Sequence, residues 1–312
     1  PGGGPRWAGP GDPPSRPSTR GVLTLSARDA GGPCRRAIDL WADHVDAMNL
    51  AGLTIDGPEG RLKAANIRAT RELLPDESFD LYVIATKSFA VRKSAEAIAK
   101  TLAPDAMVLT IQNGLGAGDD VAAFVPKSQI ILGVAEGFGA SMIGPAHAAH
   151  TSMKQIRLGL MQGVDDHRLS RVADAWHDGG FHIEIYDDIA QLIWEKLLCN
   201  VTLSGPCTAF GRNVAELRAQ AAEWNIALSC MKEAYAIGTQ LGINFSFDDP
   251  VRYVTEFADR VGTAKPSMLQ DHEAQRTSEI GTINGAILKL GNELNMPTPY
   301  NETICAVIRA RE

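Results

Sequence analysis

The chain has 312 residues, of which 45% are hydrophobic and 21% charged, and a formal net charge of −7. This length can bury a sizeable core and favours two domains, while the negative charge argues against nucleic acid as a main partner. No apolar run approaches the roughly 18 residues needed to span a bilayer, so a membrane is not expected as a partner. The five cysteines are scattered and form no C-x-x-C pair, and no leader of basic then apolar residues opens the sequence. Reduced thiols and a cytoplasmic location are therefore expected.

Residues 1–37 have the composition of a disordered or linker segment. They are rich in Pro, Gly, Ser and Arg, which cannot build a packed core. A short strand over 22–25 is the one regular element expected there.

From residue 38 to 187 the sequence alternates strands and helices. Such alternation predicts a parallel sheet in an α/β layer fold. The run LYVIAT is apolar throughout, as expected of a strand buried on both faces. A helix is expected over 93–102, and a hairpin joins 53–55 to 62–64. The expected strands cover residues 81–86, 107–111, 130–134, 156–160 and 182–186.

From residue 188 to 312 the sequence predicts an almost wholly helical domain. Its last long segment carries apolar residues at steps of three and four, a buried helical stripe. This stripe consists of Ile280, Ile283, Ile287, Leu290 and Leu294. Pro266-Ser267-x-x-Gln270 predicts a capping-box start for a helix, and Pro297 and Pro299 predict its end. The expected division is thus 1–37, 38–187 and 188–312.

Polar residues recur every four positions in the apolar run that opens the helical domain. Lys196, Asn200 and Ser204 would form one column on a helix. A lysine among Trp194 and its apolar neighbours is costly to desolvate, so it favours a functional role. The alternative is a snorkelling surface lysine with an exposed polar stripe, which is about as frequent.

Two expected strands end in polar residues. Lys87 follows the strand over 81–86, and Asn113-Gly114 follows the strand over 107–111. Ligands of open α/β sheets bind beyond the carboxyl ends of the strands, so both lie where a cofactor or substrate would bind. Each has a plainer interpretation, a solvated lysine in one case and a tight turn in the other.

Taken together, these segments resemble the ketopantoate reductase family (2-dehydropantoate 2-reductases). The matching segments are DLYVIATKSF, IQNGLG, ILGVAEGFGA with GPAHAAHT, IWEKLLCN, and SMLQDHEAQRTSEIGTINGAI followed by MPTP. They occur in the family's order from about residue 38 onward. The resemblance implies a Rossmann-like domain followed by a helical domain, an active site in the cleft between them, and NADPH-dependent reduction of a branched 2-keto acid. It is also compatible with a homodimer.

The resemblance implies a role for each matching residue. Lys196 matches the general acid that protonates the ketone oxygen, and Glu279 matches an acidic residue that contacts the substrate and supports catalysis. Asn200 and Ser267 match residues that bind the substrate, and we add Ser204 because it continues the column. Lys87, Asn113 and Asp39 lie at expected cofactor positions. A cation that donates its proton suits the negative charge that develops on a ketone oxygen as hydride arrives.

The sequence departs from the family at three places. It has no G-x-G-x-x-G turn to bind a pyrophosphate, because its early glycines lie among prolines. A shifted reading frame or a wrong start in the source gene would explain this. Asp39 near the second strand favours a ribose hydroxyl, hence NAD, whereas NADP is the family default. Ala264 replaces an asparagine that often binds substrate, so 2-keto acids other than ketopantoate remain candidates.

Other residues suggest less chemistry. His147-x-x-His150 lacks the third ligand that a zinc site needs, so no metal is expected. Cys199 lies among apolar residues and is interpreted as a packed thiol. Two functions remain, an NAD(P)H-dependent 2-keto acid reductase and a non-catalytic remnant of the same fold that has lost dinucleotide binding.

Overall fold

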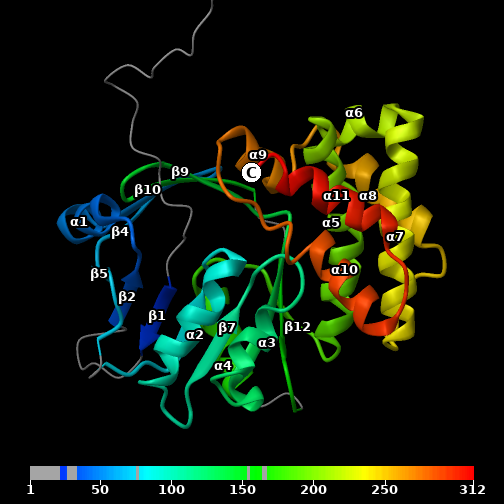
Figure 1. Cartoon of the computed structure of the whole chain (residues 1–312). Coiled ribbons are helices and arrows are strands. Elements are labelled where there is room, and N and C mark those ends of the chain that lie inside the picture. Colours follow the sequence, from blue (N-terminus) through cyan, green and yellow to red (C-terminus); the bar gives the residue numbers. More distant parts are fainter. Residues whose placement is uncertain (1–21, 27–33, 75–76, 153–154, 164–166) are drawn as a thin grey trace, which may run out of the picture.

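The protein forms a sheet domain and a helical domain, which lie side by side in Figure 1. The structure is a computed structural model that describes residues 22–26, 34–74, 77–152, 155–163 and 167–312. The last strand of the main sheet ends at Ile185, and the first helix of the helical domain begins at Ile189. The remainder of the expected atypical segment, 1–21 and 27–33, lies outside the described residues.

The sheet domain is built on one eight-stranded sheet. Its strands, in spatial order, are β12 (Ile183–Ile185), β11 (Gln155–Leu160), β8 (Ile130–Glu136), β7 (Met107–Thr110), β6 (Leu81–Ile84), β1 (Val22–Ser26), β2 (Cys34–Ile38) and β5 (Arg68–Thr70). The helices of this domain are α1 (Ala42–Ala51), α2 (Val91–Ala99), α3 (Ala117–Ala122) and α4 (His167–Asp178), with short 3-10 turns η1 (Ser88–Ala90) and η2 (Lys127–Gln129).

The central strands are buried on both faces, as their continuous apolar runs predict. Every residue of β6 and of β7 is buried. Tyr82 and Val108 pack with α2 and α3 residues on one face, while Val83 and Leu109 pack with α4 residues on the other. Strands β6, β7 and β8 are parallel, so their carboxyl ends meet at one edge of the sheet. That edge faces the helical domain (Figure 1).

The expected parallel pairing is confirmed for the central strands, but the sheet also contains antiparallel pairs at two places. Strand β11 is antiparallel to β8, and β1 is antiparallel to both β2 and β6. The expected short strand over 22–25 is confirmed as β1, whereas β2 is a strand in a stretch where no further regular structure was expected. Only the seven residues 27–33 connect these two strands, whereas a parallel crossover needs about a dozen or more, usually including a helix. A hairpin is therefore the pairing that this length permits.

A smaller four-stranded sheet lies beside the main one. Its order is β4 (Gly60–Ala64), β3 (Leu53–Gly57), β10 (His147–Ser152) and β9 (Gly139–Gly144). The expected hairpin is confirmed, because Leu53 pairs with Ala64 in antiparallel register. Strand β9 follows β8 closely and reaches across toward the helical domain (Figure 1).

The helical domain packs around α5 (Ile189–Phe210), a helix that is buried over most of its length. Trp194 and Leu198 of α5 lie in a core shared with other helices of the domain. These helices are α6 (Val214–Ala219), α7 (Ala221–Gln240), α8 (Pro250–Val261), α9 (Ser267–Glu273), α10 (Asn284–Leu294) and α11 (Pro299–Arg309). Within the described part of the chain, no helix is both long and apolar enough to cross a membrane.

Two expected features of this domain are wrong. The apolar stripe does not belong to a single helix, because α10 begins at Asn284, while Ile280 and Ile283 are buried in the turns before it. Ser267 is not a capping residue either. Pro266 holds the cap position of α9, and the Gln270 side chain donates to the carbonyl of Lys265 instead of reaching back to the cap.

Candidate active site

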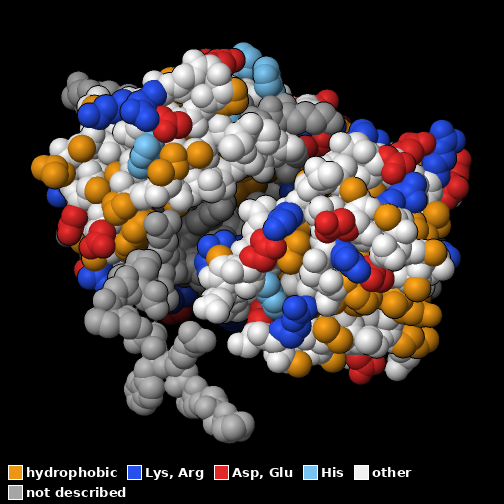
Figure 2. Space-filling view, turned by 90° about the horizontal axis from the view of Figure 1, so that it is seen from above, with side chains coloured by type: hydrophobic (Ala, Val, Ile, Leu, Met, Phe, Trp, Pro, Cys, Tyr) orange, Lys and Arg blue, Asp and Glu red, His pale blue; other side chains and the backbone are white. Residues whose placement is uncertain are grey.

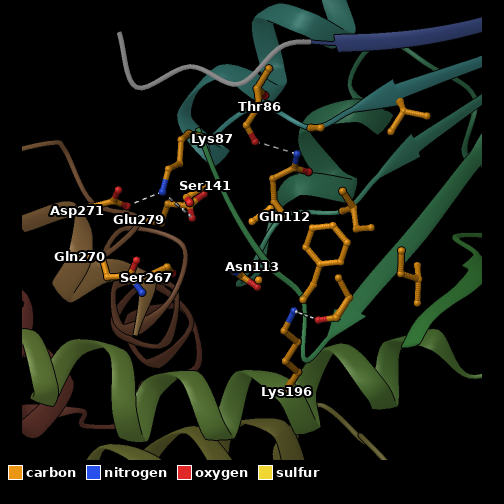
Figure 3. Close-up of a pocket in the computed structure, with 18 of the residues that line it drawn as sticks. Thr86, Lys87, Gln112, Asn113, Ser141, Lys196, Ser267, Gln270, Asp271 and Glu279 are labelled. Carbon is orange, nitrogen blue, oxygen red and sulfur yellow. Dashed lines mark hydrogen bonds and ion pairs between the residues drawn. The ribbon is translucent and has the colours of Figure 1, made fainter. Parts of the chain in front are cut away.

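A pocket of about 660 Å³ lies between the carboxyl edge of the sheet and the helical domain. Figure 2 shows it as a hollow between the two lobes, and Figure 3 shows its lining. The lining includes five residues that the sequence singled out: Lys87, Asn113, Lys196, Ser267 and Glu279. Side chains from five separate segments of the chain thus converge on one cavity.

Lys196 reaches the pocket from α5. Its ammonium donates a 2.7 Å hydrogen bond to the carbonyl oxygen of Ala135, near the end of β8. Burial lowers the pKa of Lys196 to about 8, although Glu136 and Glu279 partly offset this by favouring the charged form. The interpretation as an exposed snorkelling lysine does not fit a half-buried side chain that lines a pocket. At neutral pH this amine is protonated, yet it gives up its proton more readily than an ordinary lysine.

Lys87 forms an ion-paired cluster with residues of the helical domain. Its ammonium lies 2.5 Å from the Asp271 carboxylate of α9 and 3.6 Å from the Glu279 carboxylate. Glu279 also accepts a 2.9 Å hydrogen bond from the backbone N–H of Ser88, and Arg276 donates to Asp271 at 2.9 Å. Lys87, Asp271 and Glu279 are largely buried, so their opposite charges compensate one another. The cluster joins the strand end of β6 to the segment before α10.

Asn113 and Gly114 form a turn at the end of β7 that touches the helical domain. Gly114 has φ +88°, and the hydroxyl of Thr282 donates to the carbonyl of Asn113 at 3.5 Å. The N–H of Leu115 also donates to the carbonyl of Thr282 at 2.8 Å. The turn interpretation is therefore confirmed, and the turn places the Asn113 side chain in the pocket lining.

The other two residues of the polar column lie outside the pocket. Asn200 is half-buried and Ser204 buried on α5, and neither lines the pocket. Each helical turn advances about 5.4 Å along the axis, which carries them away from the sheet edge that Lys196 reaches. Their part in binding substrate stays a prediction.

Asp39 lies just after β2, at the same edge of the sheet as the end of β6, because Val22 of β1 pairs with both Ile38 and Ile84; it does not line the pocket. Its carboxylate accepts a 2.8 Å hydrogen bond from the N–H of Trp41, and burial raises its pKa. Arg36 is buried and pairs with Glu77. That guanidinium is thus committed within the protein rather than presented to a phosphate group.

The residues at the strand ends fit a ligand such as a dinucleotide, but the chain has no motif that fits the pyrophosphate. At the strand ends the hydroxyl of Thr86 is buried and has no partner among the described residues, so it is open to a ligand beside Lys87 and Asn113. The pyrophosphate normally binds a glycine turn at the start of a crossover helix between the first two strands. The seven residues 27–33 are fewer than such a crossover needs, and their sequence contains no G-x-G-x-x-G motif.

Sequence reasoning missed two residues that shape this site. Asp271 stands within the quoted SMLQD segment, but a lone carboxylate carries no signal that it pairs with a lysine 184 positions away. Gln112 donates to the carbonyls of Ile84 and Thr86 at 2.8 and 3.0 Å, and so ties the ends of β6 and β7 together. Its place directly after a buried strand was the available signal.

Cys199 and His147, the other residues considered from the sequence, have contacts that fit a structural role. Burial raises the pKa of the Cys199 thiol to about 12, as expected of a packed cysteine. His147 contacts Asp56 at 2.8 Å on the smaller sheet. Over the described ranges, no three or more His, Cys, Asp and Glu side chains are grouped so that they could hold a metal ion.

Comparison with known proteins agrees with this architecture. Residues 31–163 match the family model described as ketopantoate reductase PanE/ApbA, and residues 188–312 match the model of its C-terminal part. A 2-dehydropantoate 2-reductase of Streptococcus pyogenes is 25% identical over 277 residues, which cover 88% of this chain and 89% of that protein. One from Lactococcus lactis is 26% identical over 286 residues, covering 90% and 91%.

Solved structures show the same fold. D-mandelate dehydrogenase in a ternary complex with NADH and anilino(oxo)acetate superposes with a TM-score of 0.78 at 26% identity, covering 88% of this chain and 89% of that chain. The 2-dehydropantoate 2-reductase from Geobacter metallireducens gives a TM-score of 0.79 at 25% identity, covering 88% and 91%.

Proposed function

Because the chain belongs to the ketopantoate reductase PanE/ApbA family, we propose that it reduces 2-dehydropantoate or a related 2-keto acid to the 2-hydroxy acid, with a nicotinamide dinucleotide as reductant. The observation that carries the proposal is the position of Lys196. A lysine with a lowered pKa lines the cavity that the strand-end residues and two carboxylates also line. This arrangement supports the reduction of a ketone, because it places a proton donor beside the strand ends.

The proposed chemistry needs one proton from the protein. A nicotinamide bound at the strand ends would supply the hydride that adds to the carbonyl carbon. As negative charge develops on the carbonyl oxygen, the Lys196 ammonium stabilises it and transfers a proton to it. The hydrogen bond to the Ala135 carbonyl keeps the amine at the sheet edge before substrate arrives. The neutral amine left behind is tolerated because burial already favours it.

The other polar groups would orient the substrate. We propose that Glu279 contacts the polar end of the substrate. Lys87 and Ser88 hold the Glu279 carboxylate in place. The Ser267 hydroxyl at the start of α9 would bind the substrate carboxylate. Asn200 and Ser204 would bind the substrate only if the surface of α5 that carries them moved toward it.

For the reductant we propose a preference for NADH. Asp39 suits a ribose hydroxyl and would repel a 2′-phosphate, while Arg36 is already paired with Glu77. The structural relative D-mandelate dehydrogenase was solved with NADH, which is consistent with this choice. NADPH, the default for the family, remains the alternative.

The test is turnover followed at the nicotinamide absorbance band. Ketopantoate and a simpler branched 2-keto acid are each supplied with NADH and with NADPH. The proposal expects oxidation of at least one reductant with at least one keto acid, and formation of the matching 2-hydroxy acid. No turnover in any of the four combinations would refute it.

A second candidate function is a remnant that binds small acids without reducing them. The antiparallel β1–β2 hairpin favours it, because a hairpin takes the place of the crossover that binds pyrophosphate. Titration calorimetry separates the two. The remnant predicts binding of a 2-hydroxy acid but none of NADH or NADPH.

We also propose that the chain self-associates as a homodimer. Tyr300 and Val307 on α11 are exposed apolar side chains on the helical domain, which supports an interface there. Light scattering of the full chain tests this, and a strictly monomeric mass would contradict it.

A further inference from the structure

Glu279 stands in a stretch without regular helix. Residues 274–283 link α9 to α10, and the Glu279 carboxylate faces the cleft, where Ser88 and Lys87 contact it. A carboxylate on such a link depends on outside contacts for its position, because a link lacks the repeating hydrogen bonds of a helix.

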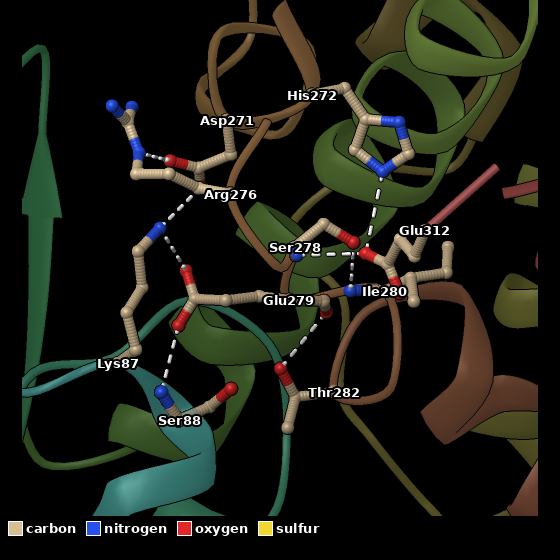
Figure 4. Close-up of polar contacts among 10 residues, drawn as sticks. All are labelled: Lys87, Ser88, Asp271, His272, Arg276, Ser278, Glu279, Ile280, Thr282 and Glu312. Atoms are coloured by element: carbon tan, nitrogen blue, oxygen red, sulfur yellow. Dashed lines mark hydrogen bonds and ion pairs between the residues drawn. The ribbon is translucent and has the colours of Figure 1, made fainter. Parts of the chain in front are cut away.

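The opposite side of the link is held by Glu312, which follows α11. Its Oε1 accepts a 2.8 Å hydrogen bond from the backbone N–H of Ser278 and lies 3.3 Å from Nε2 of His272 (Figure 4). The Ser278 hydroxyl in turn accepts from the N–H of Ile280 at 3.3 Å. Ser278 and Ile280, the two neighbours of Glu279, are thus both tied down.

We propose that Glu312 is a positioning residue for the reaction: by holding the backbone of Ser278 it sets where the Glu279 carboxylate stands in the active site. The inference rests on the proposed role of Glu279. Glu312 does not line the pocket and would touch neither substrate nor reductant, so any effect on turnover must pass through the link.

The charge state of Glu312 supports this role. Burial alone would raise its pKa, but the hydrogen bonds from Ser278 and His272 bring that pKa below its usual value. An ionised carboxylate is the stronger acceptor for a backbone N–H. Glu312→Gln keeps an acceptor oxygen with the same reach but without the charge, whereas Glu312→Ala removes the acceptor altogether.

The experiment is a double-mutant cycle between Glu312→Ala and Glu279→Gln. We expect Glu312→Ala to lower kcat about ten- to a hundredfold with a smaller change in KM, since misplacement by about 1 Å has an effect of this size. Glu312→Gln should restore most of the rate. In the Glu279→Gln background the Glu312→Ala change should have almost no further effect. Independent, multiplicative effects of the two changes would overturn the proposal.

The matched control is Glu233→Ala. Glu233 is another glutamate whose carboxylate accepts distant backbone N–H groups, those of Tyr300 and Asn301, and it does not line the pocket. A loss of stability without a fall in kcat is expected there. An equal fall in kcat for Glu233→Ala and Glu312→Ala would mean that Glu312 acts only on stability, and would refute positioning.

A readout without turnover separates this inference from the proposed function. Hydrogen exchange of the Ser278 and Ile280 amides should accelerate in Glu312→Ala and stay near the wild-type rate in Glu312→Gln. If the wild-type chain lacks reductase activity, the proposed function fails, while this measurement still tests whether Glu312 holds the backbone of Ser278. Unchanged exchange in Glu312→Ala would contradict it.

Discussion

The ammonium of Lys196, on the first helix of the helical domain, donates a 2.7 Å hydrogen bond to the carbonyl of Ala135 on β8 of the sheet domain. One side chain thus spans the boundary between the domains at the edge where ligands of α/β sheets bind. Burial desolvates the ammonium and lowers its pKa, while the bond holds it at the pocket lining. Activity and stability therefore make opposite demands on this residue.

Ketone reduction should depend on pH through Lys196. The acid must be protonated, and its pKa is about 8. The rate of keto acid reduction should be level below that pH and fall about tenfold for each further unit above it. Oxidation of the 2-hydroxy acid should rise over the same range, because it needs the neutral amine. Rate profiles in both directions measure this, and a reduction rate unchanged across pH 8 would contradict the assignment.

Replacing Lys196 by Met should stabilise the fold while abolishing reduction. A lysine whose folded pKa is depressed binds fewer protons when folded than when unfolded, between about 8 and its usual 10.5. Its charged form therefore destabilises the fold at neutral pH. We expect Lys196→Met to raise the free energy of unfolding by about 1–3 kcal/mol at pH 7, an advantage that shrinks as the pH rises through this window. Urea unfolding tests it, and a clear loss of stability would count against it.

Breaking the ion pair between Lys87 and Asp271 should lower the free energy of unfolding substantially. Asp271→Asn leaves the largely buried Lys87 ammonium with only the more distant Glu279 carboxylate to offset it. The expected loss is about 3 kcal/mol of unfolding free energy, as for other buried pairs that lose one partner. Glu256→Gln, which breaks the exposed pair with Arg252, should leave the free energy of unfolding almost unchanged. Equal losses in the two variants would show that the Lys87 pair is effectively solvated.

Gly114 and Gly116 provide a matched pair for testing the contact between the domains. Both have a positive φ, +88° and +95°, so alanine is strained at either position. At Gly114 an added Cβ would also lie 2.1 Å from the carbonyl oxygen of Thr282, while at Gly116 it meets nothing within 4 Å.

Gly116→Ala should therefore cost about 1 kcal/mol, the backbone contribution alone. Gly114→Ala should cost at least twice as much and lower turnover, because the turn and the 274–283 link must separate. Thermal unfolding and the reduction rate measure both effects. Similar behaviour of the two variants would refute the close contact.

Dinucleotide affinity should depend on the connection between the first two strands. Replacing residues 22–38 by the strand, glycine turn, helix and strand of a family relative would restore the backbone N–H groups that bind pyrophosphate. We expect the dissociation constants of NADH and NADPH to fall at least tenfold in this chimera, as measured by calorimetry. Equal affinities before and after replacement would mean that this segment does not limit binding.

Local patterns predicted the parts of the fold that depend on local burial. The apolar run from Leu81 to Ile84 gave a buried strand, and the four-residue spacing placed Lys196 on a helix. The same kind of pattern failed for Ile280 and Ile283, because residues buried in turns can match a helical stripe. Periodicity reports burial and cannot report which hydrogen bonds the backbone makes.

Long-range pairings in the site were beyond such reasoning. Nothing local in the sequence indicates that Lys87 meets Asp271 or that Glu312 meets Ser278. Asn200 and Ser204 were grouped with Lys196 because the column implies a shared face. A shared face does not fix which part of the helix lies against the cavity.

The most direct test of the central claim is the single-turnover rate of Lys196→Ala relative to the wild-type chain, with 2-keto acid and reductant both saturating. Removing a general acid should slow the proton-coupled step by about 10²- to 10⁴-fold while the bound complex still forms. A Lys196→Ala chain that reduces the keto acid at the wild-type rate would show that the proton comes from elsewhere.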